Sequence, residues 1–283
     1  MRVDHGLFGP DSVSWRVIGH PSTLVGGLRA LQIQALHPLA MAGVAQHSDY
    51  LEDPVTRLRR TARYVSTVTF GTTEEAEAAA AIVRRVHRHV HGTDPVTGKT
   101  YSASNPATMT WVHCVEVHSF LAAYRAYARP LSRADQDRFL AEQVEAAVLL
   151  GIPHGRVPDS VDSFRDYFAS VQGELRTSEE ALTAINFARR MHLSGLPLAQ
   201  RLVMEPAFRV MGDAATALVP RSLRRLAGLP DPGLLSLPNR LAVTTASNAV
   251  SVGLNLPVVG GVMAQAGDQT LGARPRPRAA VAA

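Results

Sequence analysis

Residues 72–92, TTEEAEAAAAIVRRVHRHVHG, restrict the fold more than any other stretch, because they carry the signals for both ends of a helix. Thr72 or Thr73 can cap the N-terminus, acidic residues fill the first turns, and basic residues fill the last turns. This order of charges complements the helix dipole, and Gly92 is expected to end the helix. The segment therefore predicts one long α-helix.

Similar signals recur along the chain. Residues 22–48 have apolar side chains near helical spacing, and Pro38 is expected to kink or restart the helix. Asp53 is a predicted N-cap of the next helix, with Pro54 in its first turn and Gly71 at its end. Further helices are predicted within residues 109–128, 132–153, 159–175 and 178–192.

Beyond residue 192 the chain is expected to stay mostly helical. No alternation of strands and helices and no internal repeat is visible, so the predicted fold class is all-α. We expect a single helical domain over residues 1–268 and a disordered Pro- and Arg-rich tail over residues 269–283. Helix breaks are expected at Pro197, Pro206, Pro220 and Pro230.

The charge balance argues against one class of partner. The 283 residues carry a net charge of +5, but the arginines are scattered and form no basic stripe interleaved with aromatic residues. Binding to nucleic acid is therefore not expected. An anionic substrate or a peripheral contact with a membrane stays open.

Two observations favour a cytoplasmic protein. Cys114 is the single cysteine, which excludes an intramolecular disulfide and suits a reducing compartment. The N-terminus lacks the apolar core of a signal peptide, and the apolar run at residues 24–45 is interrupted by Arg29 and His37. No run reaches the roughly 20 residues of a spanning helix.

Three histidines, His87, His89 and His91, alternate at the end of the first segment. On one continuous helix His87 and His91 share a face, where a pair at this spacing can chelate a metal ion. The acidic partner of the HExxH metal motif is absent, however. Spacing alone therefore leaves two interpretations open, a metal site or a solvated basic helix end.

A second group of candidates lies in WVHCVEVH, on a helix that is otherwise apolar. His113 and His118 could be ligands, but a histidine in such a place more often bonds a buried carbonyl. Cys114 could be a thiolate ligand of haem iron or a small core residue. His37 and His47 are expected to be buried polar residues that need partners.

The stretch RLRRT places Arg57, Arg60 and Thr61 on one helix face. Two arginines that point together repel each other, so they call for an anion beside them. That anion could be a carboxylate of the protein, a substrate or a cofactor propionate. A solvated surface is the alternative interpretation.

Taken together, several stretches resemble the family of the mycophenolic-acid pathway enzyme MpaB and the rubber-cleaving latex clearing proteins. The resemblance runs from about residue 6 to about residue 240, and LVPRSLRRLAGLP resembles the family's closing segment. The stretches that carry it, in order, are GLFGPDSVSWRV, ALHPLAMAGVAQHS, DPVTRLRRTARYVSTVTFGT, VHRHVHGTDPVTGKTYSASNP and TWVHCVEVHSFLAAY.

The resemblance implies an all-helical fold with a globin-like core that binds haem b. The family's HxxVxG pattern falls on residues 87–92, so the implied axial ligand of the iron is His87. The distal R-x-x-K-T arrangement matches Arg57, Arg60 and Thr61. Arg60 replaces the lysine, which implies an open or water-bound distal site because arginine hardly ever loses its proton. His113 is a further candidate pocket residue.

The resemblance also implies a function. We expect a haem b-dependent oxygenase that uses dioxygen on a hydrophobic small molecule of isoprenoid or other unsaturated kind. An acidic residue that the rubber enzymes carry as a base has no assigned match in this sequence. Two alternatives stay open: a haem-binding or sensing protein without turnover, and a haem-free helical protein whose histidines are structural or bind another metal. The sequence leaves the oligomeric state open.

Overall fold

A computed structural model gives the fold, and it describes residues 4–231 and 241–245. The N-terminal half holds α1 (Val13–Ile18), α2 (Thr23–Gln34), α3 (Pro38–His47), α4 (Pro54–Phe70) and α5 (Thr73–His87). A hairpin of β1 (His91–Thr93) and β2 (Thr100–Ser102) follows. The rest comprises α6 (Pro106–Tyr127), α7 (Arg133–Leu149), α8 (Val161–Val171), α9 (Glu179–Arg189), α10 (Leu198–Ala217) and α11 (Arg221–Leu226).

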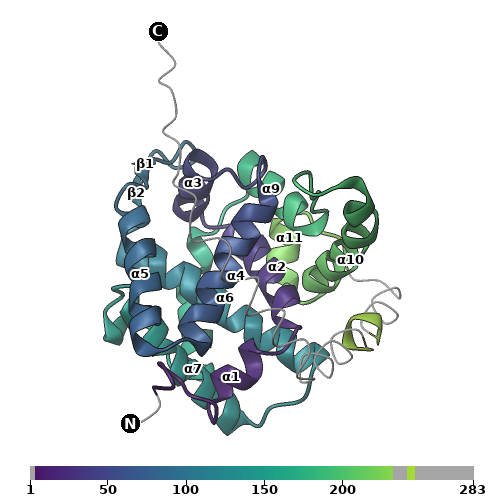
Figure 1. Cartoon of the computed structure of the whole chain (residues 1–283). Coiled ribbons are helices and arrows are strands. Elements are labelled where there is room, and N and C mark those ends of the chain that lie inside the picture. Colours follow the sequence, from purple (N-terminus) through teal and green to yellow (C-terminus); the bar gives the residue numbers. More distant parts are fainter. Residues whose placement is uncertain (1–3, 232–240, 246–283) are drawn as a thin grey trace.

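The longest of these helices, α6, runs through the middle of the fold (Figure 1). It begins sharply because Asn105 accepts a hydrogen bond from the Ala107 amide and Pro106 occupies the first turn. No glycine or proline follows within the helix. Side chains of α6 enter three separate apolar clusters, formed with α2 and α9, with α1 and α7, and with α2 and α10. This helix therefore joins the parts of the core.

The predicted break at Pro38 is confirmed. Helix α2 ends at Gln34, and α3 starts at Pro38 with His37 as its N-cap. The His37 ring accepts a 3.4 Å hydrogen bond from the Ala40 amide through Nδ1, and its Nε2 lies 3.7 Å from Glu174. His37 is thus a buried polar residue with partners, as the sequence suggested.

Both ends of α4 and the start of α5 also follow the prediction. Asp53 caps α4 by accepting a hydrogen bond from the Thr56 amide, and Gly71 lies at the C-terminus of this helix. Thr72 and Glu75 form a reciprocal capping box at the start of α5. Gly71 and Thr72 alone separate the two helices, which therefore pack as an antiparallel pair.

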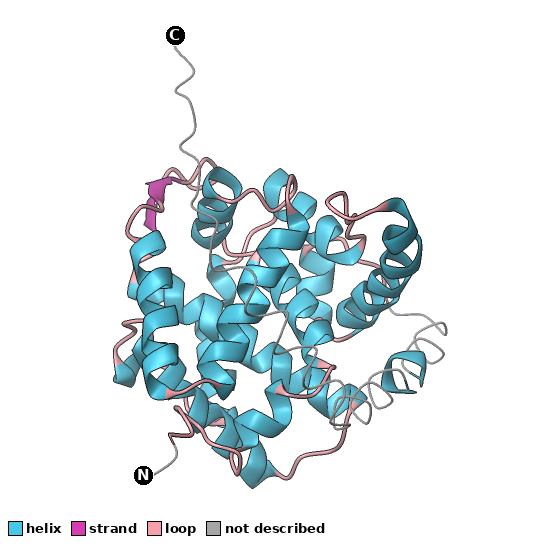
Figure 2. Ribbon diagram, viewed as in Figure 1, coloured by secondary structure: helices cyan, strands magenta, loops and turns pink. Residues whose placement is uncertain are grey.

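The predicted end of the next helix is wrong. Helix α5 ends at His87 rather than near Gly92, and residues 91–93 form strand β1 (Figure 2). Gly92 is opposite Tyr101 in the hairpin, and a Cβ on Gly92 would lie 2.8 Å from the Tyr101 hydroxyl. The Tyr101 hydroxyl donates to Gln46 Oε1 at 2.7 Å and lies 3.1 Å from His47 Nε2. The glycine therefore makes room for a tyrosine that ties the hairpin to α3.

A second correction concerns α10. Pro206 lies inside this helix and does not break it, whereas Pro197 and Pro220 precede helix starts as expected. The all-α fold class is confirmed for the described residues, in which the short hairpin is the only sheet. The proposed tail at residues 269–283 lies outside the described residues, and the domain limits stay a prediction. No helix among the described residues is long and apolar enough to cross a membrane.

Candidate functional site

The antiparallel packing of α4 and α5 brings two predicted site residues to the same end of the helix pair. Arg57 lies near the start of α4 and His87 is the last residue of α5. Because the helices are joined at Gly71 and Thr72, both residues lie far from the connection. The Arg57 charge lowers the pKa of His87, so the two side chains lie within each other's electrostatic field.

Arg57 is held by its own helix. Its Nη1 donates a 2.9 Å hydrogen bond to Thr61 Oγ1, and the Thr61 hydroxyl donates to the Arg57 carbonyl at 3.2 Å. The guanidinium is accessible to solvent, yet burial lowers its pKa, because protein surrounds most of it. Arg57 is therefore a partly desolvated cation that a ligand from solvent can still reach.

Arg60 differs from its two predicted neighbours. Its side chain is exposed, and its charge lowers the pKa of Arg57 by repulsion. The charge of Arg60 also contributes to the lowered pKa of Asp53, although hydrogen bonds from Thr56 are the larger cause there. The structure therefore joins Arg57 and Thr61 directly, while Arg60 stands beside them without a hydrogen bond to an acid among the described residues.

His87 presents an unusual ring. Its Nδ1 is buried and has no hydrogen-bond partner among the described residues. Burial first, and then the charge of Arg57, lower the pKa of the imidazole, which is therefore neutral near pH 7. A neutral imidazole with a free ring nitrogen is the form that binds a metal ion.

The other two histidines of this segment, His89 and His91, are exposed at the surface. His89 is exposed, and its Nδ1 lies 2.9 Å from the Arg85 carbonyl. His91 is exposed on β1, so the expectation that His87 and His91 share a helix face is wrong. The helix ends too early for that pairing, because the hairpin takes over the backbone hydrogen bonds.

Glu116 on α6 lies within the electrostatic field of Arg57, and the sequence interpretation missed it. Burial raises the pKa of this carboxyl to about 7, against the opposing effect of the Arg57 charge. Burial and the Glu116 charge also raise the pKa of Tyr64 on α4. A signal was present, since Glu116 is a lone acid on an apolar helix three residues after His113. We call Arg57, Thr61, Tyr64, His87 and Glu116 the α4–α6 site.

His113 lies next to this site rather than opposite His87. It is buried, and its pKa falls to about 4 through burial, although the Gln143 backbone partly opposes the shift. His113 lines a cavity of about 40 Å³ together with Tyr64, Glu116 and Gln143. Its Nε2 has no partner among the described residues. A cavity of this size and polarity can hold water that links His113 to Glu116.

Cys114 has no role in the site. The side chain is fully buried, and burial raises the pKa of the thiol, so the thiolate form is suppressed. Its neighbours are the apolar residues of the cluster that α6 forms with α1 and α7. The interpretation as a small core residue therefore accounts for Cys114.

The residues of the α4–α6 site, together with Arg60 beside it, fit a haem group. Haem needs an uncharged imidazole with an available nitrogen for its iron, and His87 has one. It also needs cations for its propionates, and Arg60 is an exposed arginine without a carboxylate hydrogen bond in the described part of the chain. Among the same residues, no three His, Cys, Asp or Glu side chains gather around a bare metal ion.

Comparison with known proteins assigns the chain to a family. No curated protein and no solved structure matches it. A family model described as "ER-bound oxygenase mpaB/B'/Rubber oxygenase, catalytic domain" matches residues 15–248, which is most of the chain. That range contains α2 to α11 and therefore every residue of the α4–α6 site. The chain belongs to the family of mpaB-type and rubber oxygenase catalytic domains.

Proposed function

We propose that this protein is a haem b-dependent oxygenase that uses dioxygen to oxidise a hydrophobic, unsaturated small molecule. The family is one of oxygenases. The observation that carries the proposal is the pairing of His87 with Arg57: a neutral imidazole with an unpartnered nitrogen lies within the electrostatic field of a cation that Thr61 holds in place.

His87 would hold the haem iron through its free nitrogen. Arg57, which Thr61 holds in place, would line the opposite side of the site and could donate hydrogen bonds from its remaining N–H groups to a ligand that gains negative charge. Arg60 would bind a propionate, since it is exposed next to Arg57. When bound, haem would supply the activation of dioxygen.

Glu116 would donate or accept protons in this reaction. Its pKa of about 7 places it near equal populations of acid and carboxylate at neutral pH. The charge of Arg57 favours the carboxylate form of Glu116, while burial favours the protonated acid. The protonation of Glu116 therefore responds to any change of charge in the α4–α6 site. The water-sized cavity with His113 behind it offers a route for a proton away from the site.

A spectrum tests the haem proposal. The full-length protein, purified from cells supplied with haem, is expected to show a Soret band with about one haem per chain. His87→Ala should lose most of this band because the imidazole ligand is gone. His89→Ala and His91→Ala are matched controls from the same segment, and both should keep it, because both side chains are exposed on the surface.

Two results would contradict the proposal. The cofactor assignment fails if the wild-type protein binds no haem, and the ligand assignment fails if His87→Ala retains the wild-type spectrum. Turnover is tested separately by supplying the reduced haem protein with oxygen and unsaturated hydrocarbons. An oxygenase consumes oxygen in step with product, whereas a sensing protein binds oxygen reversibly and forms none.

A further inference from the structure

A second and larger cavity lies on the other face of α6. Its volume is about 460 Å³, within the range of small-molecule sites. It is enclosed by α2, α6, α7, α8 and α11, and its wall is mainly apolar. His118 of α6 lines this cavity, whereas Glu116 faces the α4–α6 site. Two residues correspond to a rotation of about 200° around a helix, so the two sites lie on opposite faces of α6.

The charges around this cavity are all of one sign. Its charged lining residues are Arg29, Arg125 and Arg165, and no aspartate or glutamate lines it among the described residues. Arg165 is paired with Asp162 at 2.9 Å. Arg125 is exposed and makes no ion pair with any described residue. The cavity is therefore apolar with an excess of positive charge.

Arg29 gives the strongest indication of a ligand. Its side chain is only 2% exposed, and its hydrogen bonds go to neutral acceptors, from Nε to the Leu218 carbonyl at 3.0 Å and from Nη1 to Ser119 Oγ at 2.6 Å. Nη2 makes no hydrogen bond with any described residue, and Arg29 lines the cavity. Burial lowers the pKa of Arg29 only to about 10, and it stays charged at pH 7.

A buried cation without a counter-ion is costly, because neutral acceptors replace only part of its lost hydration. His118 does not offset the charge. Its pKa is lowered to about 3, by burial first and then by Arg29 and Arg125, so the ring is neutral. The ring lies against Phe164 and Phe168, with centroids 6.5 Å and 5.1 Å away. The cavity thus combines an uncompensated cation with an aromatic wall.

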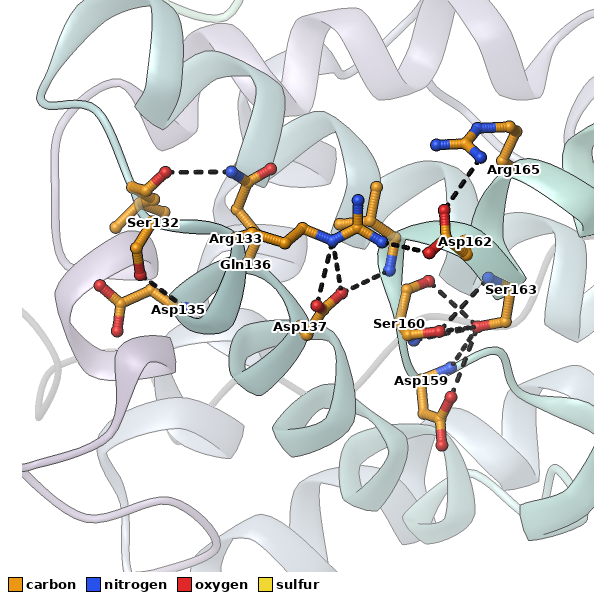
Figure 3. Close-up of polar contacts among 12 residues, drawn as sticks. Ser132, Arg133, Asp135, Gln136, Asp137, Asp159, Ser160, Asp162, Ser163 and Arg165 are labelled. Carbon is orange, nitrogen blue, oxygen red and sulfur yellow. Dashed lines mark hydrogen bonds and ion pairs between the residues drawn. The ribbon is translucent and has the colours of Figure 1, made fainter.

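The aromatic wall is held in place by polar contacts between α7 and α8. Arg133 of α7 bonds to Asp137 at 3.0 Å and to Asp162 of α8 at 2.6 Å (Figure 3). Asp137 also accepts a 2.8 Å hydrogen bond from the Val161 amide at the start of α8. These contacts fix the helix that carries Phe164 and Phe168, so the cavity is preformed.

We infer that this cavity binds an amphipathic monoanion of the long-chain carboxylate class, with its head group at Arg29 and Arg125 and its chain along Phe164 and Phe168. A carboxylate matches the guanidinium groups in charge and geometry. A single acyl chain matches the apolar wall. The α4–α6 site is on the other side of α6, so this binding does not depend on haem.

Calorimetric titration of the full-length protein with dodecanoate, below its micelle concentration, tests the inference. We expect saturable binding with one site per chain, and binding of dodecanol that is weaker by about tenfold or more, because the alcohol lacks the charge. Arg125→Gln should weaken dodecanoate binding and leave dodecanol binding unchanged. Arg129→Gln is the matched control, since it removes the same charge from an exposed residue that does not line the cavity.

Two further variants locate the site. Ala122→Phe places a ring inside the cavity and should abolish binding, with an unchanged circular dichroism spectrum to show that the fold is intact. His87→Ala should leave dodecanoate binding unchanged even though it loses haem. The inference is overturned if dodecanoate and dodecanol bind equally, if Arg125→Gln binds like the wild type, or if Ala122→Phe still binds.

Discussion

The guanidinium of Arg57 donates a 2.9 Å hydrogen bond to Thr61 Oγ1, one turn further along α4. This contact fixes the Arg57 guanidinium, whose charge lowers the pKa of His87 and opposes the raised pKa of Glu116. One hydrogen bond within a helix therefore sets the electrostatic environment of side chains on two other helices.

Loss of the Thr61 hydroxyl should affect the site more than the fold. We expect Thr61→Val to lower the free energy of unfolding by less than about 1 kcal/mol, because the bond is exposed. The freed guanidinium should move away from the α4–α6 site, which removes positive charge from beside the bound ligand. The stretching frequency of carbon monoxide on the reduced haem protein should therefore rise. Thr61→Ser keeps the hydroxyl and should retain the wild-type frequency. Equal frequencies in all three proteins would disprove the placement of Arg57.

Glu116 should make the haem-free protein less stable as the pH rises. The carboxyl has a pKa of about 7 in the folded chain and an ordinary value near 4.5 in the unfolded chain. Between these values the folded chain holds more protons, so the free energy of unfolding falls as the pH increases. The groups that face Glu116 are Arg57, which opposes the shift, Tyr64 and His113.

Glu116→Gln removes this titration and nearly preserves the shape. Chemical denaturation at pH 8 should show the variant to be more stable than wild type by about 1–3 kcal/mol, and the difference should vanish below pH 4.5. Glu77→Gln, at an exposed residue of α5, should show no such dependence. A pH-independent difference for Glu116→Gln would mean that the carboxyl is not desolvated.

Two adjacent glycines of α2 should respond oppositely to alanine. A Cβ on Gly26 would lie 3.0 Å from the Phe120 Cα, Phe120 Cδ1 and Ser119 carbonyl oxygen, so α2 and α6 would have to separate. A Cβ on Gly27 would meet nothing within 4 Å. Gly26→Ala should therefore lower stability by about 1–3 kcal/mol, and Gly27→Ala should raise it by up to about 1 kcal/mol. Thermal denaturation of both variants measures the two changes in stability. An equal effect of the two substitutions would refute the close packing of α2 against α6 at Gly26.

The contact of Gly92 with Tyr101 predicts a coupled pair of substitutions. Gly92→Ala should displace the Tyr101 hydroxyl from Gln46 and His47 and cost about 1–2 kcal/mol. Without the hydroxyl, in a Tyr101→Phe background, the same substitution should cost less, because the closest atom is gone. A double-mutant cycle from urea denaturation measures this coupling. Additive effects would show that the hydroxyl is not what excludes a side chain at Gly92.

Helix starts were predictable from the sequence because their signals are local. Asp53 and Thr72 each bond an amide three residues ahead, so the residue pattern contains the whole interaction. The end of α5 was not predictable in the same way. There the helix competes with a hairpin whose second strand, at Thr100–Ser102, lies several residues beyond the histidines. A helix end that depends on pairing with a later strand has no signal in the residues around it.

The residues of the candidate site also differ in whether local sequence signals predict them. Arg57 and Thr61 are one turn apart on one helix, and their spacing alone places them together. Glu116 meets them only through the packing of α6, because it lies far along the chain and its pKa depends on that burial. Family resemblance predicted His87 as the ligand, whereas spacing could not separate it from His89 and His91. The structure distinguishes His87 through its buried nitrogen.

Because Glu116 and His118 open on different sides of α6, the number of residues in that helix is fixed. Inserting or deleting one residue within it turns everything beyond by about 100°. That rotation would turn His118, Ala122 and Arg125 away from the larger cavity that they line. By contrast, the tip of the hairpin turn meets no neighbouring element, since a Cβ on Gly98 would have nothing within 4 Å. In evolution, relatives of this protein should thus vary in length at the hairpin and keep α6 constant.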